Sequence, residues 1–442
     1  MNSTGTPARC GTALLASGLI VGAPRSGSGK TVVTLGLIAA LRARGLVVAA
    51  AKTGPDYIDT AILSRVAGLP AVNLDPWAMQ SGRLRGLAAT AAEAADLLVV
   101  EGVMGLFDGA ADGTGSTGDL AAMLELPVVL VVDCERQAQS VAALVGGFAR
   151  WRADVRVEAV ILNRVASPRH EVMLRGALDQ TGIACLGALP RDGALVLPER
   201  HLGLVLPDEV ASFDDTVAAA ARIISDRLDL EALVRLAAPL ANDAVPAVPL
   251  APLGQHIAMA QDGAFAFAYA HHLTGWRAAG ASISFFSPLA DEPPAADADA
   301  VFLPGGYPEL HAGRLAAALR FKAGLVAARD RGALIYGECG GYMALGRTLV
   351  DAQGVGHEMA GLLPVETRFD RPRRHLGYRR LSHASPLPWP ARLAGHEFHY
   401  SSGAGSGPPL FSATDALGGE LPPMGTIAGR VLGSYAHVID IG

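Results

Sequence analysis

The sequence predicts an α/β protein with two domains, each built on a mostly parallel sheet. Short apolar runs alternate with longer stretches rich in Ala, Leu and Arg, the pattern typical of βαβ units. The chain has 442 residues, enough for two large domains. A Pro- and Ala-rich stretch at 234–254 separates two such series. We therefore expect one domain at 14–233 and a second at 255–442, with a linker between them.

The first series contains five apolar runs, which predict strands covered by helices on both faces. They are SGLIVGAP (17–24), LVVAAAKTG (46–54), DLLVVEGVMG (96–105), PVVLVVD (127–133) and VEAVILNRV (157–165). The N-terminus weakly resembles a signal peptide, because Arg9 is followed by the apolar run ALLASGLIVGA, but that run leads straight into a glycine-rich loop. We therefore interpret it as a buried strand. No uninterrupted apolar stretch approaches the 18 residues of a membrane span.

The second series shows the same alternation after the linker. Its apolar runs are HIAMAQDGAFAF (256–267), ASISFFSP (281–288), DAVFLPGG (299–306) and GALIYGECGGYMALG (332–346). The last of them passes from a strand to a helix through a cysteine flanked by glycines. We expect a second parallel sheet, with this turn at its carboxyl edge.

Composition and charge exclude several classes of protein. Half of the residues are hydrophobic and 18% are charged, which excludes a disordered or collagen-like chain. There are 36 basic and 42 acidic residues, and the net charge of −6 argues against a nucleic-acid-binding protein. The four cysteines lie far apart without CxxC spacing, which argues against a disulfide framework or a zinc site. We expect a reduced, cytoplasmic protein.

The segment GAPRSGSGKT (22–31) predicts a phosphate site between the first strand and the first helix. Backbone N–H groups of such a loop bind phosphates, Lys30 reaches the terminal phosphates, and Thr31 can bind Mg²⁺. The spacing departs from the strict pattern, because Pro24 stands where a glycine is expected. The predicted ATP-binding residues of this loop are Gly27, Ser28, Gly29, Lys30 and Thr31.

Two further observations concern this site. The chain has only three lysines, Lys30, Lys52 and Lys322, and the first two fall in predicted active-site loops. A chain that otherwise uses Arg can retain Lys where a compact ammonium is needed. Asn163 ends the fifth predicted strand and is a candidate to contact the nucleotide base. Capping of the next helix is the alternative role for this side chain.

Two acidic segments also follow predicted strands, at the sheet edge where open α/β sheets bind ligands. KTGPDYIDT begins with Lys52 and contains Asp56 and Asp59, which suit Mg²⁺ or substrate. A capped turn before a helix is the alternative there. In EGVMGLFDG, Glu101 stands where a second acidic Mg²⁺ ligand is expected, and Asp108 lies in a glycine-flanked loop. For Asp108, a solvated loop carboxylate is the alternative.

In the second domain, Cys339 is a predicted nucleophile. It follows an apolar strand, lies between Gly337 and Gly340, and directly precedes a helical run. A sharp strand-turn-helix connection exposes such a side chain, and the helix N-terminus favours the thiolate. A small buried cysteine is the alternative, which Cys134 and Cys185 fit better because they lie on or beside apolar runs.

A nucleophilic cysteine needs a base, and the sequence offers three candidates. His437 follows a strand-like run in VLGSYAHVIDIG and is the first choice, while His396 and His399 in GHEFHY compete with it. The segment LPGGYPELH supplies Gly305 and Gly306, whose amides we expect to form an oxyanion hole.

Together these motifs resemble the cobyrinic acid a,c-diamide synthase family over nearly the whole chain. The segments that carry the resemblance are PRSGSGKT, KTGPDYID, EGVMGLFDG, LPRDGALVLPERHLGLV, LPGGYPE, GECGGYMALG, GHEFHYS and GSYAH. The resemblance implies an N-terminal ATP-dependent synthetase domain akin to dethiobiotin synthetase and a C-terminal class I glutamine amidotransferase domain. It also implies amidation of the a and c acetate carboxylates of a corrin ring through acyl phosphates, in cobalamin biosynthesis.

The resemblance implies roles for individual residues. Cys339 would release ammonia from glutamine, and His437 would raise its nucleophilicity. Most class I amidotransferases have Glu two residues after this histidine, but here the position is Ile439, which fits a Cys-His dyad. Tyr57 and Ile58 fall in the stretch that steers which side chain is amidated. Acidic positions that bind nucleotide, metal or reaction intermediates are matched by Asp56, Asp59, Glu101 and Asp108.

The expected partners are therefore small molecules: the corrinoid macrocycle, ATP with Mg²⁺, and glutamine. We expect no nucleic acid or membrane partner, and a homodimer is one oligomeric state that the sequence allows. The macrocycle is either cobalt-free hydrogenobyrinic acid or cobalt-containing cobyrinic acid. The segment APRSGSGKT resembles the enzymes of the cobalt-free route and favours hydrogenobyrinic acid.

Two alternatives remain at this point. The first is a cobyric acid synthase, which amidates other side chains of the ring; the segments KTGPDYID and EGVMGLFDG argue against it. The second is a regulatory or partitioning P-loop ATPase. Such a protein would need a basic face and would have no use for the Cys339 turn, so the acidic balance of the chain disfavours it.

Overall fold

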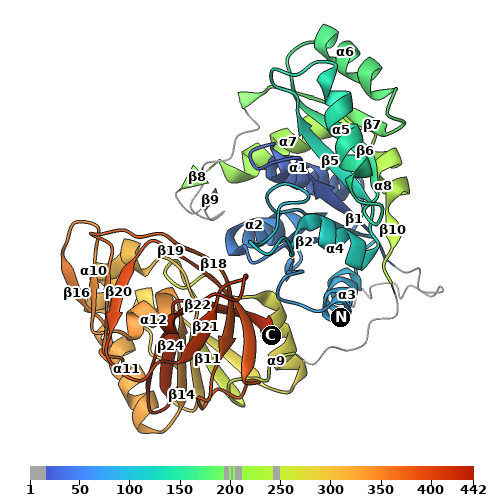
Figure 1. Ribbon diagram of the computed structural model, residues 1–442. Helices are drawn as coiled ribbons and strands as arrows, with labels where there is room; N and C mark the ends of the chain where they lie inside the picture. The colour runs from blue at the N-terminus through green and yellow to red at the C-terminus, as the bar shows by residue number, and fades with distance from the viewer. Residues whose placement is uncertain (1–15, 194–198, 201–202, 205–211, 242–248) are drawn as a thin grey trace, which may run out of the picture.

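The computed structural model describes residues 16–193, 199–200, 203–204, 212–241 and 249–442, and it confirms the predicted α/β class with two domains (Figure 1). The segment LPRDGALVLPERHLGLV, which contributes to the family resemblance, lies largely outside the described residues. No helix in the described ranges is both long and apolar enough to span a membrane.

The first domain has one central sheet with the strand order β3-β2-β4-β1-β5-β6-β7, and all of these neighbours pair in parallel. Its strands are β1 (Ser17–Gly22), β2 (Val48–Thr53), β3 (Val72–Leu74), β4 (Leu97–Glu101), β5 (Val128–Asp133), β6 (Val157–Val165) and β7 (Ala184–Pro190). The five predicted runs correspond to β1, β2, β4, β5 and β6, while β3 and β7 were not predicted. The predicted parallel sheet is thus confirmed.

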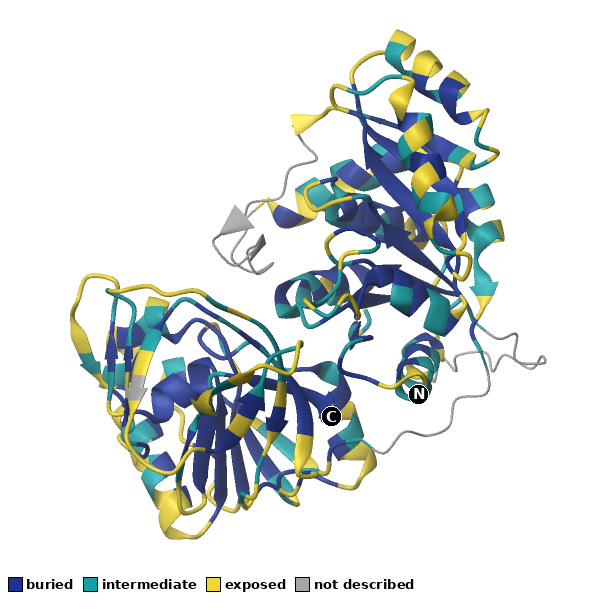
Figure 2. Cartoon of the chain, in the orientation of Figure 1, coloured by how far each residue is buried: buried dark blue, intermediate teal, exposed yellow. Residues whose placement is uncertain are grey.

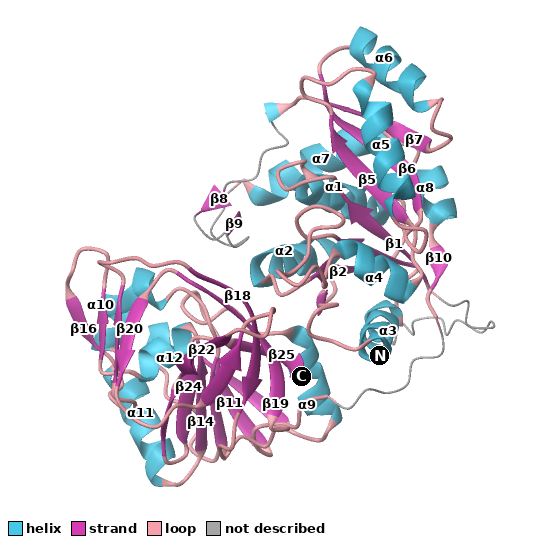
Figure 3. Ribbon diagram, viewed as in Figure 1, coloured by secondary structure: helices cyan, strands magenta, loops and turns pink. Residues whose placement is uncertain are grey.

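Helices cover both faces of this sheet (Figure 3). They are α1 (Lys30–Ala43), α2 (Tyr57–Ala67), α3 (Ser81–Ala92), α4 (Thr117–Leu124), α5 (Ser140–Trp151), α6 (Pro168–Leu178), α7 (Phe213–Arg227) and α8 (Leu230–Leu236). Alternate residues of one strand belong to different cores: Ile20 packs on one face, and Leu19 and Val21 pack on the other. This burial on both faces explains why the strands are apolar without alternation, and Figure 2 shows them as buried.

The predicted linker packs partly on each domain. The short strand β10 (Ala238–Pro239) pairs antiparallel with β1 of the first domain. Leu250 and Leu253 are buried in a core of the second domain. Residues 242–248 lie outside the described residues. The domain bounds given by the sequence therefore stay predictions.

The second domain has a central sheet with the order β12-β11-β13-β14-β24-β23, parallel except for its last strand. Its strands are β11 (His256–Ala260), β12 (Ser282–Phe286), β13 (Ala300–Leu303), β14 (Leu334–Glu338), β23 (Thr426–Ala428) and β24 (Val431–Ser434). The helices of this domain are α9 (Ala270–Ala278), α10 (Ala312–Ala317), α11 (Leu319–Asp330) and α12 (Gly340–Leu345), with the 3₁₀ turns η3 (Pro288–Ala290) and η4 (Pro308–His311).

Two further sheets complete the second domain, and the sequence analysis did not predict them. A five-stranded antiparallel sheet contains β18 (His375–Ser382), β19 (Arg392–His399), β21 (Phe411–Thr414), β22 (Glu420–Met424) and β25 (His437–Ile441). A four-stranded sheet contains β15 (Thr348–Val350), β16 (Gly356–Glu358), β17 (Val365–Arg368) and β20 (Ser402–Gly405). In the part of the chain that precedes the linker, β8 (Glu199–Arg200) and β9 (Gly203–Leu204) form a separate two-stranded sheet.

The two domains meet between the loops of the first and the antiparallel sheet of the second (Figure 1). Arg83 of α3 forms an ion pair of 2.9 Å with Asp440 of β25, and both side chains are largely buried. The hydroxyl of Tyr378 in β18 donates to the carboxylate of Asp75 at 3.1 Å. These contacts hold the carboxyl edge of the first sheet beside β18 and β25.

Candidate active sites

The loop between β1 and α1 has the backbone of a phosphate-binding loop. Gly27 and Gly29 have φ values of 76° and 88°, in the left-handed region that favours glycine. Asn163 of β6 donates from Nδ2 to the carbonyl of Ser28 at 2.9 Å, and a Cβ on Gly29 would lie 2.3 Å from that Nδ2. Asn163 therefore supports the loop backbone, and its contact with a nucleotide base stays a prediction.

Lys30 and Thr31 begin α1 and contact the end of β4 and the loop that follows it. The Nζ of Lys30 donates to the carbonyl of Met104 at 2.5 Å, and the Thr31 hydroxyl donates to Oε1 of Glu101 at 2.6 Å. Burial, and then the charge of Lys52, lowers the pKa of Lys30 to about 8. A phosphate beside Lys30 would offset the second effect, because it adds negative charge.

The predicted charged residues of the first domain come together around Lys52. This buried side chain forms ion pairs with Asp59 and, at 2.9 Å, with Oε1 of Glu101. Burial alone would lower the pKa of Lys52, but Asp59 and Glu101 raise it above its ordinary value. Asp56 caps α2 by accepting the N–H of Asp59 at 2.9 Å. Burial, and then the charge of Asp59, raises the pKa of Asp56 to about 7.

Glu101 fits a ligand for a divalent cation. Its Oε2 is buried and has no hydrogen-bond partner among the described residues, whereas Oε1 is bonded to Thr31 and Lys52. Burial raises the pKa of this carboxyl. A cation would supply the missing partner, because Mg²⁺ prefers carboxylate and hydroxyl oxygens. Thr31 is bonded to Glu101, and Asp56 is close enough for the charge of Glu101 to raise its pKa; binding of Mg²⁺ by these three residues stays a prediction.

Asp108 lies in the loop after β4, and its charge raises the pKa of Lys30. Its side chain is exposed, and Oδ2 accepts the N–H of Gly105 at 2.9 Å. A Cβ on Gly105 would lie 2.5 Å from the same oxygen, so the carboxylate and the glycine together shape the turn. Contact of Asp108 with a reaction intermediate stays a prediction.

In the second domain, Cys339 lies on the strained turn that the sequence predicts. Its backbone has φ 46° and ψ −106°, an uncommon conformation for a residue with a side chain. β14 ends at Glu338 and α12 begins at Gly340, so the turn is a single residue. A Cβ on Gly341 would lie 1.9 Å from the carbonyl oxygen of Leu303, which explains the glycine after the turn. The cysteine side chain is thereby fixed at the carboxyl edge of the sheet.

His437 is the histidine that lies next to Cys339. A Cβ on Gly305 would lie 2.3 Å from Cε1 of His437 and 3.3 Å from Cβ of Cys339, so the three residues meet at one point. Burial alone would lower the pKa of His437, but Cys339 and Glu338 raise it to about 10. His396 pairs with His437 across β19 and β25, and burial lowers its pKa to about 3.

The other predicted groups have different surroundings. His399, the third histidine candidate, is bonded to Glu397 and Ser401. The carbonyl of Gly305 accepts the N–H of Phe267 at 2.9 Å, and a Cβ on Gly306 would lie 2.2 Å from the Ala264 carbonyl oxygen. This close packing holds the predicted oxyanion turn beside Cys339, while the oxyanion role of its amides stays a prediction.

The sequence analysis missed Glu338, the residue directly before the cysteine. Its Oε1 accepts the Tyr336 hydroxyl and the Val438 N–H, both at 3.1 Å, and its Oε2 lies 3.7 Å from Nδ1 of His437. The available signal was an acidic residue at the end of an otherwise apolar strand. Such a residue is almost never fully buried without a partner.

A cavity of about 420 Å³ lies between the domains and is lined by residues of both, among them Asp56 and His437. Tyr57 of α2 stacks on Tyr269 at a ring distance of 4.3 Å and lies 5.0 Å from the ring of His437. The residues of the first domain at this cavity include Asp56, Tyr57, Ile58, Val103 and Met104. Those of the second domain are Phe267, Leu376, Gly377, Tyr378, His396, Phe398 and His437. Asp56, which belongs to the cluster around Lys52, and His437, which lies next to Cys339, thus border the same space.

Comparison with known proteins gives the same two-part arrangement. Residues 19–205 match the CobQ/CobB/MinD/ParA nucleotide binding domain, and residues 256–440 match the CobB/CobQ-like glutamine amidotransferase domain. The chain is 56% identical over 428 residues to the hydrogenobyrinate a,c-diamide synthase of Brucella suis biovar 1 (strain 1330), covering 96% of this chain and 98% of that protein. The chain belongs to the hydrogenobyrinate a,c-diamide synthase family.

Two other members of the hydrogenobyrinate a,c-diamide synthase family show similar coverage. The protein of Rhizobium meliloti (strain 1021) is 53% identical over 426 residues, which are 96% of this chain and 99% of that protein. The protein of Rhodobacter capsulatus is 50% identical over 432 residues, 96% of this chain and 98% of that protein. The predicted family resemblance and the predicted enzyme class, a ligase with an amidotransferase domain, are confirmed.

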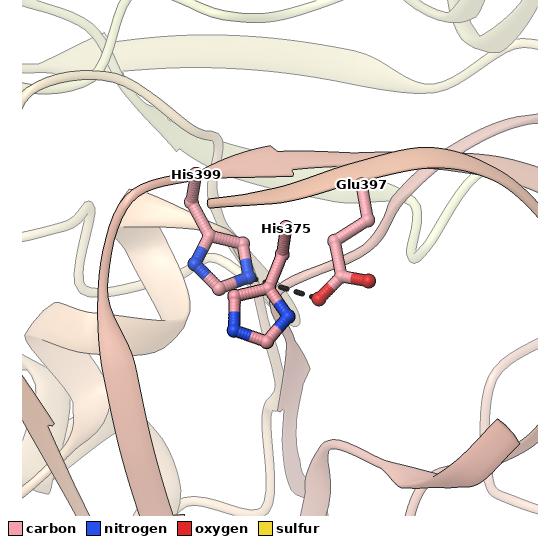
Figure 4. A group of neighbouring side chains, drawn as sticks. All are labelled: His375, Glu397 and His399. Carbon is pink, nitrogen blue, oxygen red and sulfur yellow. Dashed lines mark hydrogen bonds and ion pairs between the residues drawn. The ribbon is translucent and has the colours of Figure 1, made fainter. Parts of the chain in front are cut away.

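One more cluster of this synthase-family chain has the composition of a metal site. The ligand atoms of His375, Glu397 and His399 lie within 4.8 Å of one another (Figure 4). However, Nε2 of His399 is already bonded to Glu397 at 2.9 Å, and Arg379 pairs with the same carboxylate at 2.8 Å.

The two imidazole rings of this cluster are also stacked, with centroids 4.7 Å apart and planes inclined by 11°. Nearly parallel stacked rings cannot both direct an in-plane nitrogen lone pair at one ion, as metal ligation requires. His399 in turn stacks on Tyr435 at 4.4 Å. We therefore assign the cluster to the packing of β18 against β19.

Proposed function

We propose that this protein uses ATP and glutamine to amidate the a and c acetate carboxylates of hydrogenobyrinic acid. The observation that carries the proposal is the shared cavity, which Asp56 borders from the P-loop side and His437 borders from the cysteine side. An enzyme that makes ammonia at one site and consumes it at another needs such a connection. The choice of hydrogenobyrinic acid as the macrocycle rests on the names of the similar proteins, which are hydrogenobyrinate a,c-diamide synthases.

In the first domain the reaction begins with activation of the carboxylate, which by itself resists attack by ammonia. A carboxylate oxygen attacks the γ-phosphorus of ATP, ADP leaves, and an acyl phosphate forms. Lys30 and the loop amides stabilise the negative charge on the transferred group. Mg²⁺, when held by Thr31, Glu101 and Asp56, would neutralise phosphate charge. Ammonia then attacks the acyl carbon and phosphate leaves, which gives the amide.

In the second domain the thiolate of Cys339 attacks the amide carbon of glutamine. His437 donates a proton to the leaving nitrogen, so the C–N bond breaks and ammonia is released. Water then attacks the thioester while His437 accepts its proton, and glutamate and the thiolate are formed. The ammonia reaches the acyl phosphate through the cavity between the domains.

Mass analysis of the product tests this function directly. The protein is incubated with ATP, Mg²⁺, glutamine and either hydrogenobyrinic or cobyrinic acid, with ATP omitted as the control. We expect two replacements of OH by NH₂ on hydrogenobyrinic acid, and none without ATP. Conversion of cobyrinic acid alone would contradict the choice of macrocycle, and lack of amide product with both would contradict the proposed function. Amidation at other side chains would favour a cobyric acid synthase.

Cellular setting and assembly are further proposals. We propose that the reaction takes place in the cytoplasm, where ATP and glutamine are available. The cysteines in the described ranges, Cys134, Cys185 and Cys339, are all free thiols, which supports a reducing compartment. A homodimer stays a prediction from the sequence.

Gly305→Ala should impair the use of glutamine but not of ammonia. The added Cβ would lie 2.3 Å from Cε1 of His437, so the imidazole must leave its position beside Cys339. Misplacement of a reacting group by about 1 Å lowers the rate by about 10²-fold. We expect such a loss in glutamine-dependent amidation, with the ammonia-dependent rate unchanged. Gly313→Ala is the matched control, because its nearest neighbour would lie 3.7 Å away. Equal rates for both variants would argue against the assigned site.

A further inference from the structure

We propose that Glu338 is a positioning residue for His437 and takes the place of the acidic residue that this chain lacks at position 439. It holds the imidazole in the tautomer that keeps its proton on Nδ1, which leaves Nε2 to exchange protons at Cys339. The amidotransferase domain would then work with three residues, Cys339, His437 and Glu338, where the sequence suggested a dyad. This inference rests on the proposed glutaminase reaction.

Glu338 can take this role although it lies on β14, a different strand from the one that carries His437. Most class I amidotransferases carry the acidic residue on the strand of the histidine, but here Ile439 is fully buried in a hydrophobic core. Glu338 instead ends β14, which pairs in parallel with β24, and β25 with His437 follows directly. Its Oε2 lies 3.7 Å from Nδ1 of His437. A small rotation closes this gap to a hydrogen bond, and catalytic contacts are often this long before substrate binds.

The carboxylate of Glu338 is itself fixed in orientation. One oxygen, Oε1, accepts both the Tyr336 hydroxyl and the N–H of Val438 at 3.1 Å. The second oxygen is thereby directed to the side of His437. The Nδ1 atom of that ring is buried and has no hydrogen-bond partner among the described residues. A buried polar atom without a partner is costly, so Glu338 is the group that can satisfy it.

Three titratable side chains on the elements around His437 are neutral at ordinary pH. Burial lowers the pKa of His396 in β19 to about 3 and also lowers the pKa of His272 in α9. Burial raises the pKa of Tyr57 in α2 well above its usual value. The groups that raise the pKa of His437 are Cys339 and Glu338. Because both raise its pKa, removal of one negative charge should make His437 lose its proton at lower pH.

Glu338→Gln tests the inference with little change in shape. The side-chain carbonyl of the new residue can still accept from Tyr336 and Val438. Its NH₂ group would face Nδ1 of His437 and favour the tautomer with the proton on Nε2. We expect kcat for glutamine hydrolysis to fall by about 10²-fold or more, with KM for glutamine little changed. We also expect the alkaline limb of the pH profile to move down by about one pH unit. Ammonia-dependent amidation should be retained.

Two further variants make the result specific. Glu338→Asp keeps the charge, so it should retain a higher kcat than Glu338→Gln and an alkaline limb near that of the unchanged protein. Glu366→Gln is the control, because Glu366 is an exposed residue of β17 that is paired with Arg368. Equal loss in both Glu338 variants with an unmoved alkaline limb would mean a structural role and overturn the inference.

The outcomes also separate this inference from the proposed function. If Glu338→Gln keeps the kcat and pH profile of the unchanged protein while Cys339→Ala cannot use glutamine, the inference fails and the proposed function stands. If Cys339→Ala still uses glutamine, the proposed function of the second domain fails, and the inference fails with it.

Discussion

Lys30→Ala should abolish amidation with glutamine and with ammonia alike. Lys30 begins α1 behind the glycine-rich loop, and its buried Nζ lies 2.5 Å from the carbonyl of Met104. In the proposed reaction this ammonium meets the phosphate groups, where negative charge shifts during transfer to the carboxylate. Loss of one such group from a buried site costs about 10³-fold in rate. Since both nitrogen donors need the acyl phosphate, both reactions should fall by at least this factor.

The measurement is ATP-dependent formation of the amidated macrocycle, followed by mass analysis with glutamine and, separately, with excess ammonia. Lys322→Ala is the natural control, because this third lysine donates to the carbonyl of Ala316 in the second domain. Its amidation rates should equal those of the unchanged protein. Persistent ATP-driven product in Lys30→Ala would refute the role of the loop. Selective loss with glutamine alone would place Lys30 in the wrong half of the reaction.

The parallel sheets could be predicted from the sequence because burial on both faces leaves a simple signature. The run VEAVILNRV corresponds to β6 without a change of bounds, and the runs around β1 and β14 lead directly into the glycine-rich loop and the Cys339 turn. Glycine, lysine and cysteine in these turns have few structural roles that compete with function. The candidate site residues at the ends of these strands could therefore be predicted from the sequence.

The antiparallel sheets were less visible because their strands mix polar and apolar residues. In β18, HLGYRRLS, Arg379 pairs across the sheet with Glu397, and only the complete fold shows that the two strands are neighbours. Yet β18 and β19 supply Tyr378 and His396 to the cavity between the domains. The role of Glu338 depends in the same way on contact with His437, 99 positions further along the chain. Contacts of this kind are set by tertiary packing, so a linear pattern does not reveal them.

Cys339→Ala should separate the two halves of the reaction. The substitution removes the thiolate that attacks glutamine, and the cysteine belongs to the core of the second domain. We expect glutamine-dependent amidation to be lost, because no other described cysteine can replace the nucleophile. Cys134 and Cys185 both belong to the first domain. Ammonia supplied from solution bypasses the missing step, so amidation with ammonia should continue at a rate near that of the unchanged protein.

The comparison of nitrogen donors decides between a local and a global effect of this substitution. Cys339 has a positive φ of 46°, which alanine would have to adopt as well, so the strain in the turn is the same in both proteins. Cys185→Ala is the control for loss of a thiol, since its Sγ lies near the Gly187 carbonyl in β7, and both of its rates should be unchanged. Retained ammonia-dependent activity would show that the synthetase domain works while glutamine hydrolysis is blocked. Equal loss with both donors would mean that the cysteine supports the synthetase reaction itself, and the division of labour between the two domains would have to be abandoned.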